Sequence, residues 1–296
     1  MRIARFDDDR IGVVVGEGIV DVTDALEISA GEWPPVGMNR LIRDFPIVGP
    51  VLARAAARGL VHPLSEVTLR TPVPWPNKVI AFPVNYHDHG REMQAQYRAD
   101  VQGFFLKPPS SLSGAGEPVV LPAVPGREVH HESELAIIVG AGGRDIPRAD
   151  WQAHVFGYAC LLDMVVRGRE ERVFRKAYDT FCPVGPWITT ADEVGDPTHL
   201  GMQLWVGDEL RQDANTRDLV LDIPGMIEMA SAVMTLHPGD IIATGTPAGV
   251  GPVTDGDTIR IRIERVGEMS VDVVQGTNGR TEVFARPYDP PIVKQH

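Results

Sequence analysis

The sequence predicts a β-rich α+β protein that consists of a small N-terminal α/β domain, residues 1–70, and a larger domain, residues 71–296. Strand-like segments outnumber helical segments along the chain, and this scarcity of helices disfavours a doubly wound parallel sheet. The segment TPVPWP at residues 71–76 carries three prolines, which restrict the backbone and remove hydrogen-bond donors. It therefore marks a linker between the two predicted domains.

The elements of the N-terminal domain are expected to be two strands and one helix. Residues 2–6 and 11–15 have strand-like patterns. Residues 51–58 are rich in Ala and Arg, which favour a helix.

The larger domain is expected to contain several strands and one clear helix. Residues 132–139 form a strand that ends in glycines, and residues 158–166 form a nearly continuous apolar run, typical of a strand buried on both faces. Isoleucines alternate with charged residues from 259 to 264, which predicts a strand with one wet face, and Asp255-Gly256 marks the turn before it. The helix is expected at residues 223–236, with Asp222 as its cap and Pro224 in its first turn.

The composition excludes some classes of partner. The chain has 296 residues and a formal net charge of −12, which disfavours nucleic acid and anionic membranes, although a bound cation can still attract an anionic substrate. The charged start MRIARFDDDR lacks the apolar core of a signal peptide, and no apolar stretch is long enough to span a bilayer. Cys160 and Cys182 lie outside any CxxC spacing, so we expect reduced, buried thiols in a cytoplasmic protein.

Three carboxylates carry the strongest chemical signal. Glu132 and Glu134 share one face of the predicted strand, where either solvent or a cation must offset their repulsion. Asp163 interrupts an apolar run, so it needs a metal ion or a salt bridge, for example with Arg167. Oxygen ligands favour Mg²⁺ or Mn²⁺ over zinc, with Ca²⁺ as a substitute in a crystal. Alternation places the neighbouring His131 on the other face.

A histidine and a glutamate in NYHDHGREM form a second candidate group. His89 and Glu92 are three residues apart, so on a helix the carboxylate can orient the imidazole as a general base. Gly90 between them weakens the helix, which suits a lid that orders over a ligand. The alternative is an ordinary pair on a surface helix.

The remaining candidates are a glycine-rich loop and two lysines. ATGTPAGVG at residues 243–251 lacks the P-loop spacing, but Thr246 can offer a hydroxyl and an N–H to a substrate carboxylate. The alternative is a plain turn. Lys107 and Lys176 lie beside aromatic residues and either face a site or extend from an apolar surface.

Read in order, these segments resemble the fumarylacetoacetate hydrolase family. The resemblance covers residues 75–275 and rests on NYHDHGREM, FFLKPPSSLSG, ESELAIIVG, GYACLLDMVVRGRE, KAYDTFCPVGPW, GDELRQDANT and LHPGDIIATGTPAGVG. It implies a mixed β-sandwich roll preceded by a small N-terminal domain, and a homodimer.

The resemblance also implies roles for individual residues. The metal ligands are Glu132, Glu134 and Asp163. The catalytic residues are His89, Glu92 and Lys176, and the residues expected to contact the substrate are Arg167, Thr246, Lys107 and Tyr178.

The chain departs from the family pattern where the far end of the substrate is expected. Leu162 precedes the third metal ligand in place of Asn, and Arg167 is followed by Gly168-Arg169-Glu170 rather than Asp-x-x-Gln. Arg175 precedes the lysine in place of Gly, and Tyr178 stands where the family often has Phe. Glu170 argues against an acidic substrate tail and Arg169 argues for one.

The function implied by the resemblance is hydrolysis of a C–C bond in a 2,4-dioxo acid of the acylpyruvate or fumarylpyruvate type. In this reaction the metal stabilises the enolate of the small 2-oxo acid product. The alternatives are decarboxylation of oxaloacetate, or isomerisation or hydration of a 2-oxo-enoic acid in aromatic catabolism. A binding protein without catalysis is a different class of alternative, which the His89–Glu92 pair disfavours.

Overall fold

The computed structural model describes residues 1–277, except residues 27, 29–30, 96–97 and 125. Three β-sheets dominate these residues, and most of the helices are short. The predicted β-rich α+β class is confirmed. No helix among the described residues is both long and apolar enough to cross a bilayer.

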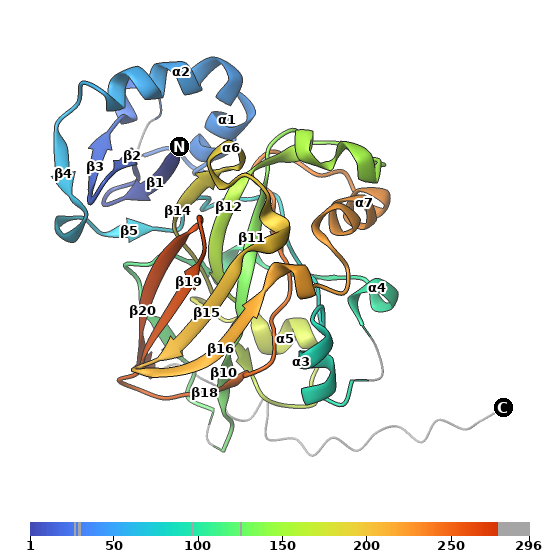
Figure 1. The fold of residues 1–296 in the computed structure, drawn as a ribbon. Helices are drawn as coiled ribbons and strands as arrows, with labels where there is room; N and C mark the ends of the chain where they lie inside the picture. Colours follow the sequence, from blue (N-terminus) through green and yellow to red (C-terminus); the bar gives the residue numbers. More distant parts are fainter. Residues whose placement is uncertain (27, 29–30, 96–97, 125, 278–296) are drawn as a thin grey trace.

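The N-terminal strands form an antiparallel meander that continues the largest sheet (Figure 1). These strands are β1 (Arg2–Phe6), β2 (Arg10–Val15) and β3 (Gly18–Asp21), and the helices α1 (Gly37–Arg43) and α2 (Phe45–Ala56) lie beside them. Strand β1 also pairs with β14 (Cys182–Thr190) of the larger domain. Residues 71–78 have no regular structure, as predicted, and the division of the chain at residue 70 remains a prediction.

The largest sheet runs in the order β4-β3-β2-β1-β14-β12-β11-β17-β6-β7. Its further members are β4 (Val61–Pro63), β12 (Val155–Leu162), β11 (Ser133–Val139), β17 (Ile241–Ala243), β6 (Val79–Ala81) and β7 (Phe105–Lys107), with β5 (Leu69–Arg70) and β8 (Leu112–Ser113) at its side. Most pairs are antiparallel, but β17 and β6 are parallel. The sheet is therefore mixed.

A second sheet covers one face of the first, as in a β-sandwich. Its order is β16 (Glu209–Asn215), β15 (Gly201–Val206), β19 (Thr258–Ile263), β20 (Gly267–Gln275) and β9 (Val119–Leu121). Leu135 and Ile137 of β11 share one core with Ile259 and Ile261 of β19. The strand predicted over residues 259–263 is present as β19. Its predicted wet face is also confirmed, because its isoleucines are buried while Arg260 and Arg262 are not.

The third sheet holds the strands that frame the candidate site. It consists of β13 (Val165–Val166), β10 (Val129–His131) and β18 (Gly251–Val253). The α-helices of this domain are α3 (His87–Glu92), α4 (Ala99–Gln102), α5 (Arg172–Lys176), α6 (Ala191–Val194) and α7 (Ile223–Val233). In α7 the Asp222 side chain caps the backbone N–H of Gly225, as predicted, although the helix ends three residues before the expected position.

One predicted strand is wrong in its extent. Residues 158–166 do not form a single strand, because β12 ends at Leu162 and the chain passes to β13 in the third sheet. At this break the backbone N–H of Asp163 bonds to the carbonyl of Glu132 at 2.9 Å, and that of Met164 bonds to Phe181 at 3.0 Å. The break brings Asp163 beside the start of β11. The two cysteines are buried and free, as expected.

Candidate metal centre and active site

Three buried carboxylates meet where β11 begins and β12 ends. Glu132 and Glu134 are 8% and 3% exposed, and Asp163 is 1% exposed. One oxygen from each lies within 4.8 Å of the others. An exposed strand face, one of the two alternatives for the glutamates, is therefore wrong. The structure brings together the three residues that the sequence predicted as metal ligands.

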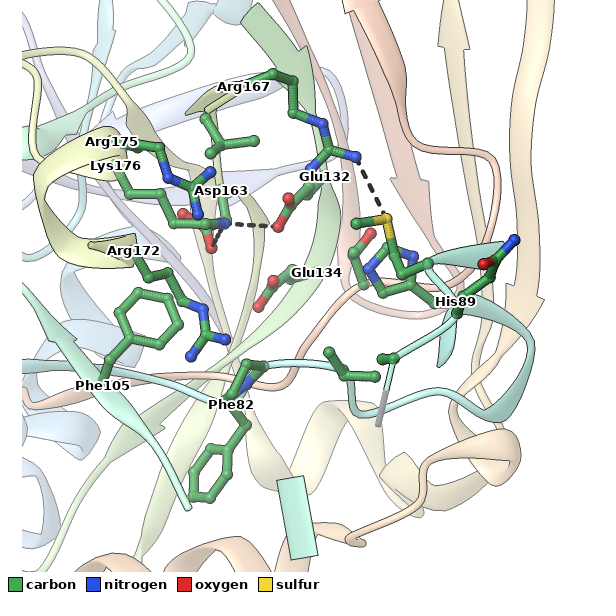
Figure 2. A pocket seen from close by; sticks show the side chains of 17 residues that line it. Phe82, His89, Phe105, Glu132, Glu134, Asp163, Arg167, Arg172, Arg175 and Lys176 are labelled. Carbon is green, nitrogen blue, oxygen red and sulfur yellow. Dashed lines mark hydrogen bonds and ion pairs between the residues drawn. The ribbon is translucent and has the colours of Figure 1, made fainter. Parts of the chain in front are cut away.

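Two lysines surround Asp163. The ammonium of Lys176, at the end of α5, bonds Oδ2 of Asp163 and lies 2.6 Å from Oε2 of Glu132 (Figure 2). The ammonium of Lys107 bonds Oδ1 of Asp163, and it also donates to the carbonyls of Lys176 at 3.0 Å and Phe181 at 3.2 Å. The alternative to a metal, a salt bridge for Asp163, is present in the structure, but its partners are the two lysines and not the suggested Arg167.

The surroundings shift the pKa values of Asp163 and Glu134 in opposite directions. Burial alone would raise the pKa of Asp163, but Lys107 and Lys176 lower it below its ordinary value. Burial raises the pKa of Glu134 well above its ordinary value, and the nearby Asp163 raises it further. Burial would lower the pKa of Lys176, but Asp163 and the two glutamates raise it.

This group of oxygens fits a hard divalent cation. Buried like charges this close repel one another unless a positive charge lies among them. The raised pKa of Glu134 indicates that the lysines do not fully offset its charge. Glu134 Oε2 accepts one bond, from the backbone N–H of Gly245 at 2.8 Å, which leaves Oε1 available to a metal. Carboxylate oxygens without thiolates suit Mg²⁺ or Mn²⁺.

The histidines beside the glutamates do not join this group in the described residues. His131 is fully buried, and burial lowers its pKa to about 4, so its ring is neutral near pH 7. His130 bonds the carboxylate of Glu128 at 2.8 Å.

The helix α3 places the predicted dyad over the carboxylates. Nδ1 of His89 lies 2.9 Å from Oε2 of Glu92, and His89 is 6% exposed. The other oxygen of Glu92 accepts the backbone N–H of Gly249 at 3.0 Å, which ties α3 to the glycine-rich loop. The His89 ring lines the cavity rather than an open surface (Figure 2).

The glycine-rich loop brings Thr246 into the same cavity. Thr246 is 3% exposed, and its hydroxyl accepts a bond from Nε2 of Gln212 at 2.8 Å. Gly245 has a φ of +93°, and a Cβ there would lie 2.8 Å from the carbonyl oxygen of Phe82. At Gly245 another backbone segment therefore lies so close that a side chain would not fit. A plain turn does not require such close approach.

Gln212 is a residue that the sequence reading missed. Its side chain is 1% exposed and joins three segments, because Oε1 accepts from Ser133 N at 3.0 Å while Nε2 donates to Thr246 and, at 2.9 Å, to Pro247 O. The only signal for it is its position in the GDELRQDANT block. A polar residue in a strand of mixed polarity does not otherwise stand out.

The cavity has a volume of about 370 Å³. It is lined by Phe82, Pro83, Val84, His89, Met93, Gln94, Ala95, Phe105, Glu132, Glu134, Asp163, Val165, Arg167, Arg172, Arg175, Lys176 and Thr246. Two predicted substrate contacts are not among these residues. Lys107 lies behind Asp163, and Tyr178 packs on Phe181 with ring centroids 5.0 Å apart. Arg172 and Arg175 were not predicted as site residues.

Glu170 and Arg169 do not line this cavity either. The carboxylate of Glu170 bonds the guanidinium of Arg127 at 2.8 and 3.1 Å, and Arg169 is exposed. The two residues that the sequence argument weighed at the substrate tail therefore lie outside the lining of this cavity, and their effect on the tail stays a prediction.

Comparison with known proteins points to one family. The family profile described as "Fumarylacetoacetate (FAA) hydrolase C-terminal" matches residues 78–274. The chain is 42% identical to maleylpyruvate hydrolase of Aquipseudomonas alcaligenes over 288 residues, which cover 92% of this chain and 99% of that protein. It is 36% identical to the human oxaloacetate tautomerase FAHD2B, mitochondrial, over 254 residues, which cover 81% of this chain and 80% of that protein.

A solved structure supports the same grouping. The crystal structure of maleylpyruvate hydrolase from Sphingobium sp. SYK-6, in complex with manganese(II) ion and pyruvate, matches with a TM-score of 0.87 and 66% sequence identity. The match covers 94% of this chain and all of that chain. The predicted mixed β-sandwich roll is confirmed by this likeness.

Proposed function

Because the chain belongs to the fumarylacetoacetate hydrolase family, we propose that it is a metal-dependent hydrolase that cleaves a C–C bond of an acylpyruvate, a 2,4-dioxo acid. The observation that carries the proposal is the placement of the His89–Glu92 pair and the three carboxylates on one cavity. Relatives named maleylpyruvate hydrolase, at 42% and 66% identity, support this reaction.

Glu132, Glu134 and Asp163 would hold the divalent ion, Mg²⁺ or Mn²⁺. When bound, such an ion supplies Lewis-acid stabilisation of negative charge on the oxygens of a 2-oxo acid. A relative of known structure contains manganese(II) and pyruvate, which supports both the ion and a small 2-oxo acid.

The dyad would activate water. The carboxylate of Glu92 accepts a hydrogen bond donated by Nδ1–H of His89, which leaves Nε2 as the base that takes a proton from water. The hydroxide attacks the C4 carbonyl, the C3–C4 bond breaks with its electrons on the pyruvate fragment, and the proton held by His89 returns to C3, which gives pyruvate and a carboxylic acid.

The other predicted residues would bind and orient the substrate. Thr246 offers its N–H and hydroxyl to the carboxylate of the 2-oxo acid, and Lys176 supplies positive charge where negative charge develops. Arg167, which lines the same cavity, would also contact the substrate. Lys107 acts through Asp163, whose carboxylate it holds, and Tyr178 supports the cavity wall.

We further propose a cytoplasmic homodimer. The family resemblance supports the dimer, and two free buried thiols are compatible with a reducing compartment.

The test compares kcat/KM for acetylpyruvate, maleylpyruvate, fumarylpyruvate and oxaloacetate with Mg²⁺ or Mn²⁺, following pyruvate release. We expect an acylpyruvate to be preferred. If oxaloacetate decarboxylation is faster by about tenfold or more, a difference of ~1.4 kcal/mol in transition-state stabilisation, the proposal is wrong. Tight metal-dependent binding without turnover of any of these acids would instead favour a binding protein, and enol–keto conversion of oxaloacetate alone would favour the tautomerase relatives.

A further inference from the structure

The loop after β13 carries Arg167, whose backbone is held on both sides by a neighbouring segment. The N–H of Arg167 donates to the carbonyl of Glu128 at 2.8 Å. The carbonyl of Arg167 accepts a bond from Nη1 of Arg127 at 3.1 Å. Two adjacent residues of the segment that leads into β10 therefore fix the backbone from which the Arg167 side chain starts.

Arg127 also forms a two-bond ion pair with Glu170 in the same loop. Its Nη2 donates to Oε1 of Glu170 at 2.8 Å, and its Nη1 donates to Oε2 at 3.1 Å. The pair lowers the pKa of Glu170 and raises the pKa of Arg127, so both groups stay charged near neutral pH. A planar guanidinium that faces both oxygens of a carboxylate fixes direction as well as distance.

Gly168 leaves the space that this ion pair occupies. A Cβ at residue 168 would lie 2.1 Å from Nη1 of Arg127 and 2.2 Å from Oε2 of Glu170, so a side chain there would displace the pair. Residues 168 and 170 are two of the positions at which the chain departs from the family pattern, with Gly and Glu in place of Asp and Gln. The two departures fit together, because both are needed for the contact with Arg127.

A second arginine holds the same loop from the side of α5. Arg175 donates to the carbonyl of Glu170 at 2.8 Å and to that of Val166 at 3.3 Å. Together with Arg127, it bonds the backbone carbonyls of three residues in the short stretch 166–170. The loop therefore has a defined conformation although it contains no helix or strand after Val166.

The side chain of Arg167 extends from this loop into the cavity (Figure 2). Its Nη2 reaches the sulfur of Met93, at the end of α3, at 3.4 Å. A long side chain magnifies any change in its backbone, and a misplacement of about 1 Å in an active site can cost about 10²-fold in rate. The position of the Arg167 guanidinium therefore depends on the contacts that hold the loop.

We propose that Arg127, with Glu170 as its partner, is a positioning residue that directs the guanidinium of Arg167 onto the bound 2-oxo acid. The inference rests on the proposed function and adds to it two residues that do not line the cavity. Arg127 acts through the loop, because it bonds the carbonyl of Arg167 itself.

The first test measures binding without turnover. Oxalate, a stable dianion that binds metal as a 2-oxo acid does, is titrated calorimetrically into enzyme loaded with Mn²⁺. Arg167→Gln should weaken oxalate binding by ~10-fold or more, because a charged hydrogen bond is lost. Arg127→Gln should weaken it by ~5-fold or more. The double variant should bind oxalate as Arg167→Gln does, because a residue that acts through Arg167 has nothing to add once that guanidinium is gone.

Two further variants separate the geometry of the pair from its charge. Gly168→Ala keeps both charges but crowds the pair, and it should weaken oxalate binding in the same direction as Arg127→Gln. The matched control is Arg40→Gln in α1, since Arg40 also bonds both oxygens of a partly exposed glutamate, Glu32. This variant should bind oxalate as wild type does.

The second test is kinetic. With acetylpyruvate and Mn²⁺, Arg127→Gln should raise KM by more than it lowers kcat, because the water-activating pair on α3 is unchanged. Thermal unfolding shows whether each variant folds, and Gly168→Ala takes the place of Arg127→Gln in the oxalate comparison if the latter does not fold.

Wild-type oxalate affinity in Arg127→Gln, or losses that add in the double variant, would overturn the assignment of Arg127. If wild type cleaves no acylpyruvate, the proposed function fails, and the oxalate comparison still tests Arg127 by itself.

Discussion

His89 and Glu92 are joined by a bond of 2.9 Å between Nδ1 and Oε2, while the second oxygen of Glu92 accepts the N–H of Gly249. A carboxylate without a proton only accepts hydrogen bonds, so in the neutral form of the ring this contact places the proton on Nδ1 and the lone pair on Nε2. The same carboxylate thus orients the His89 ring and attaches α3 to the loop that carries Thr246. The His89 ring and this loop are therefore held in one arrangement.

From this pair we predict that His89→Ala lowers kcat for acylpyruvate cleavage by roughly 10²- to 10⁴-fold, the usual effect of losing a general base. The affinities for Mn²⁺ and for oxalate should change little, because the imidazole is not in the carboxylate group. Stopped-flow measurement of pyruvate release and calorimetry provide the two readouts. His199→Ala, at an exposed histidine, is the control. Wild-type turnover in the His89 variant would mean that the pair is a structural contact.

The metal ligands give a second prediction. Glu134→Ala should weaken Mn²⁺ binding by about 100-fold or more and remove activity while the protein stays folded, since even residues behind the ligands often cost 10- to 100-fold. Titration of Mn²⁺ by calorimetry and a circular dichroism spectrum check the two parts. Glu268→Ala, at an exposed glutamate of β20, should bind metal as wild type does. Equal affinity in the Glu134 variant would exclude Glu134 from the site.

Protons should be released when the metal binds. Burial raises the pKa of Glu134 above its ordinary value of 4.5, so without metal its carboxyl stays protonated to a higher pH than in the unfolded chain. Ionisation of this group therefore costs stability as the pH rises through the raised pKa, and a divalent ion offsets that cost. We expect Mn²⁺ affinity to rise with pH through this window. Calorimetry in two buffers of different ionisation enthalpy measures the proton count, and a count of zero throughout would contradict the prediction.

The strands and the group of three carboxylates could be predicted from the sequence because both follow local rules. Alternation along residues 259–263 reports the two faces of β19, and β-strand geometry placed Glu132 and Glu134 on one face. An ionisable residue inside an apolar run identified Asp163. The order of several segments then supported the family.

The remaining features depend on contacts between distant segments. The sequence does not show the break after Leu162, because apolar residues suit both β12 in the largest sheet and β13 in the third sheet. Lys107 was expected to contact the substrate, yet its place behind Asp163 follows from pairing between β6 and β7. Arg172 was missed because its direction into the cavity depends on contacts with distant segments, among them the Phe105 ring.

The last prediction concerns Gln212. This residue connects β11 to the loop that carries Thr246 through three hydrogen bonds. Gln212→Leu has nearly the same volume, but it leaves the N–H of Ser133 and the carbonyl of Pro247 without this partner inside the protein. Each buried group left unsatisfied costs about 1–3 kcal/mol, so the free energy of unfolding should fall by about 2–6 kcal/mol. Freed from Gln212, the Thr246 hydroxyl should also bind the substrate carboxylate less well, which raises KM more than it lowers kcat. Urea denaturation and steady-state kinetics measure the two effects, and Gln203→Leu, at a partly exposed glutamine of β15, is the matched control. A Gln212 variant that loses stability but keeps the wild-type KM would restrict this residue to a structural role.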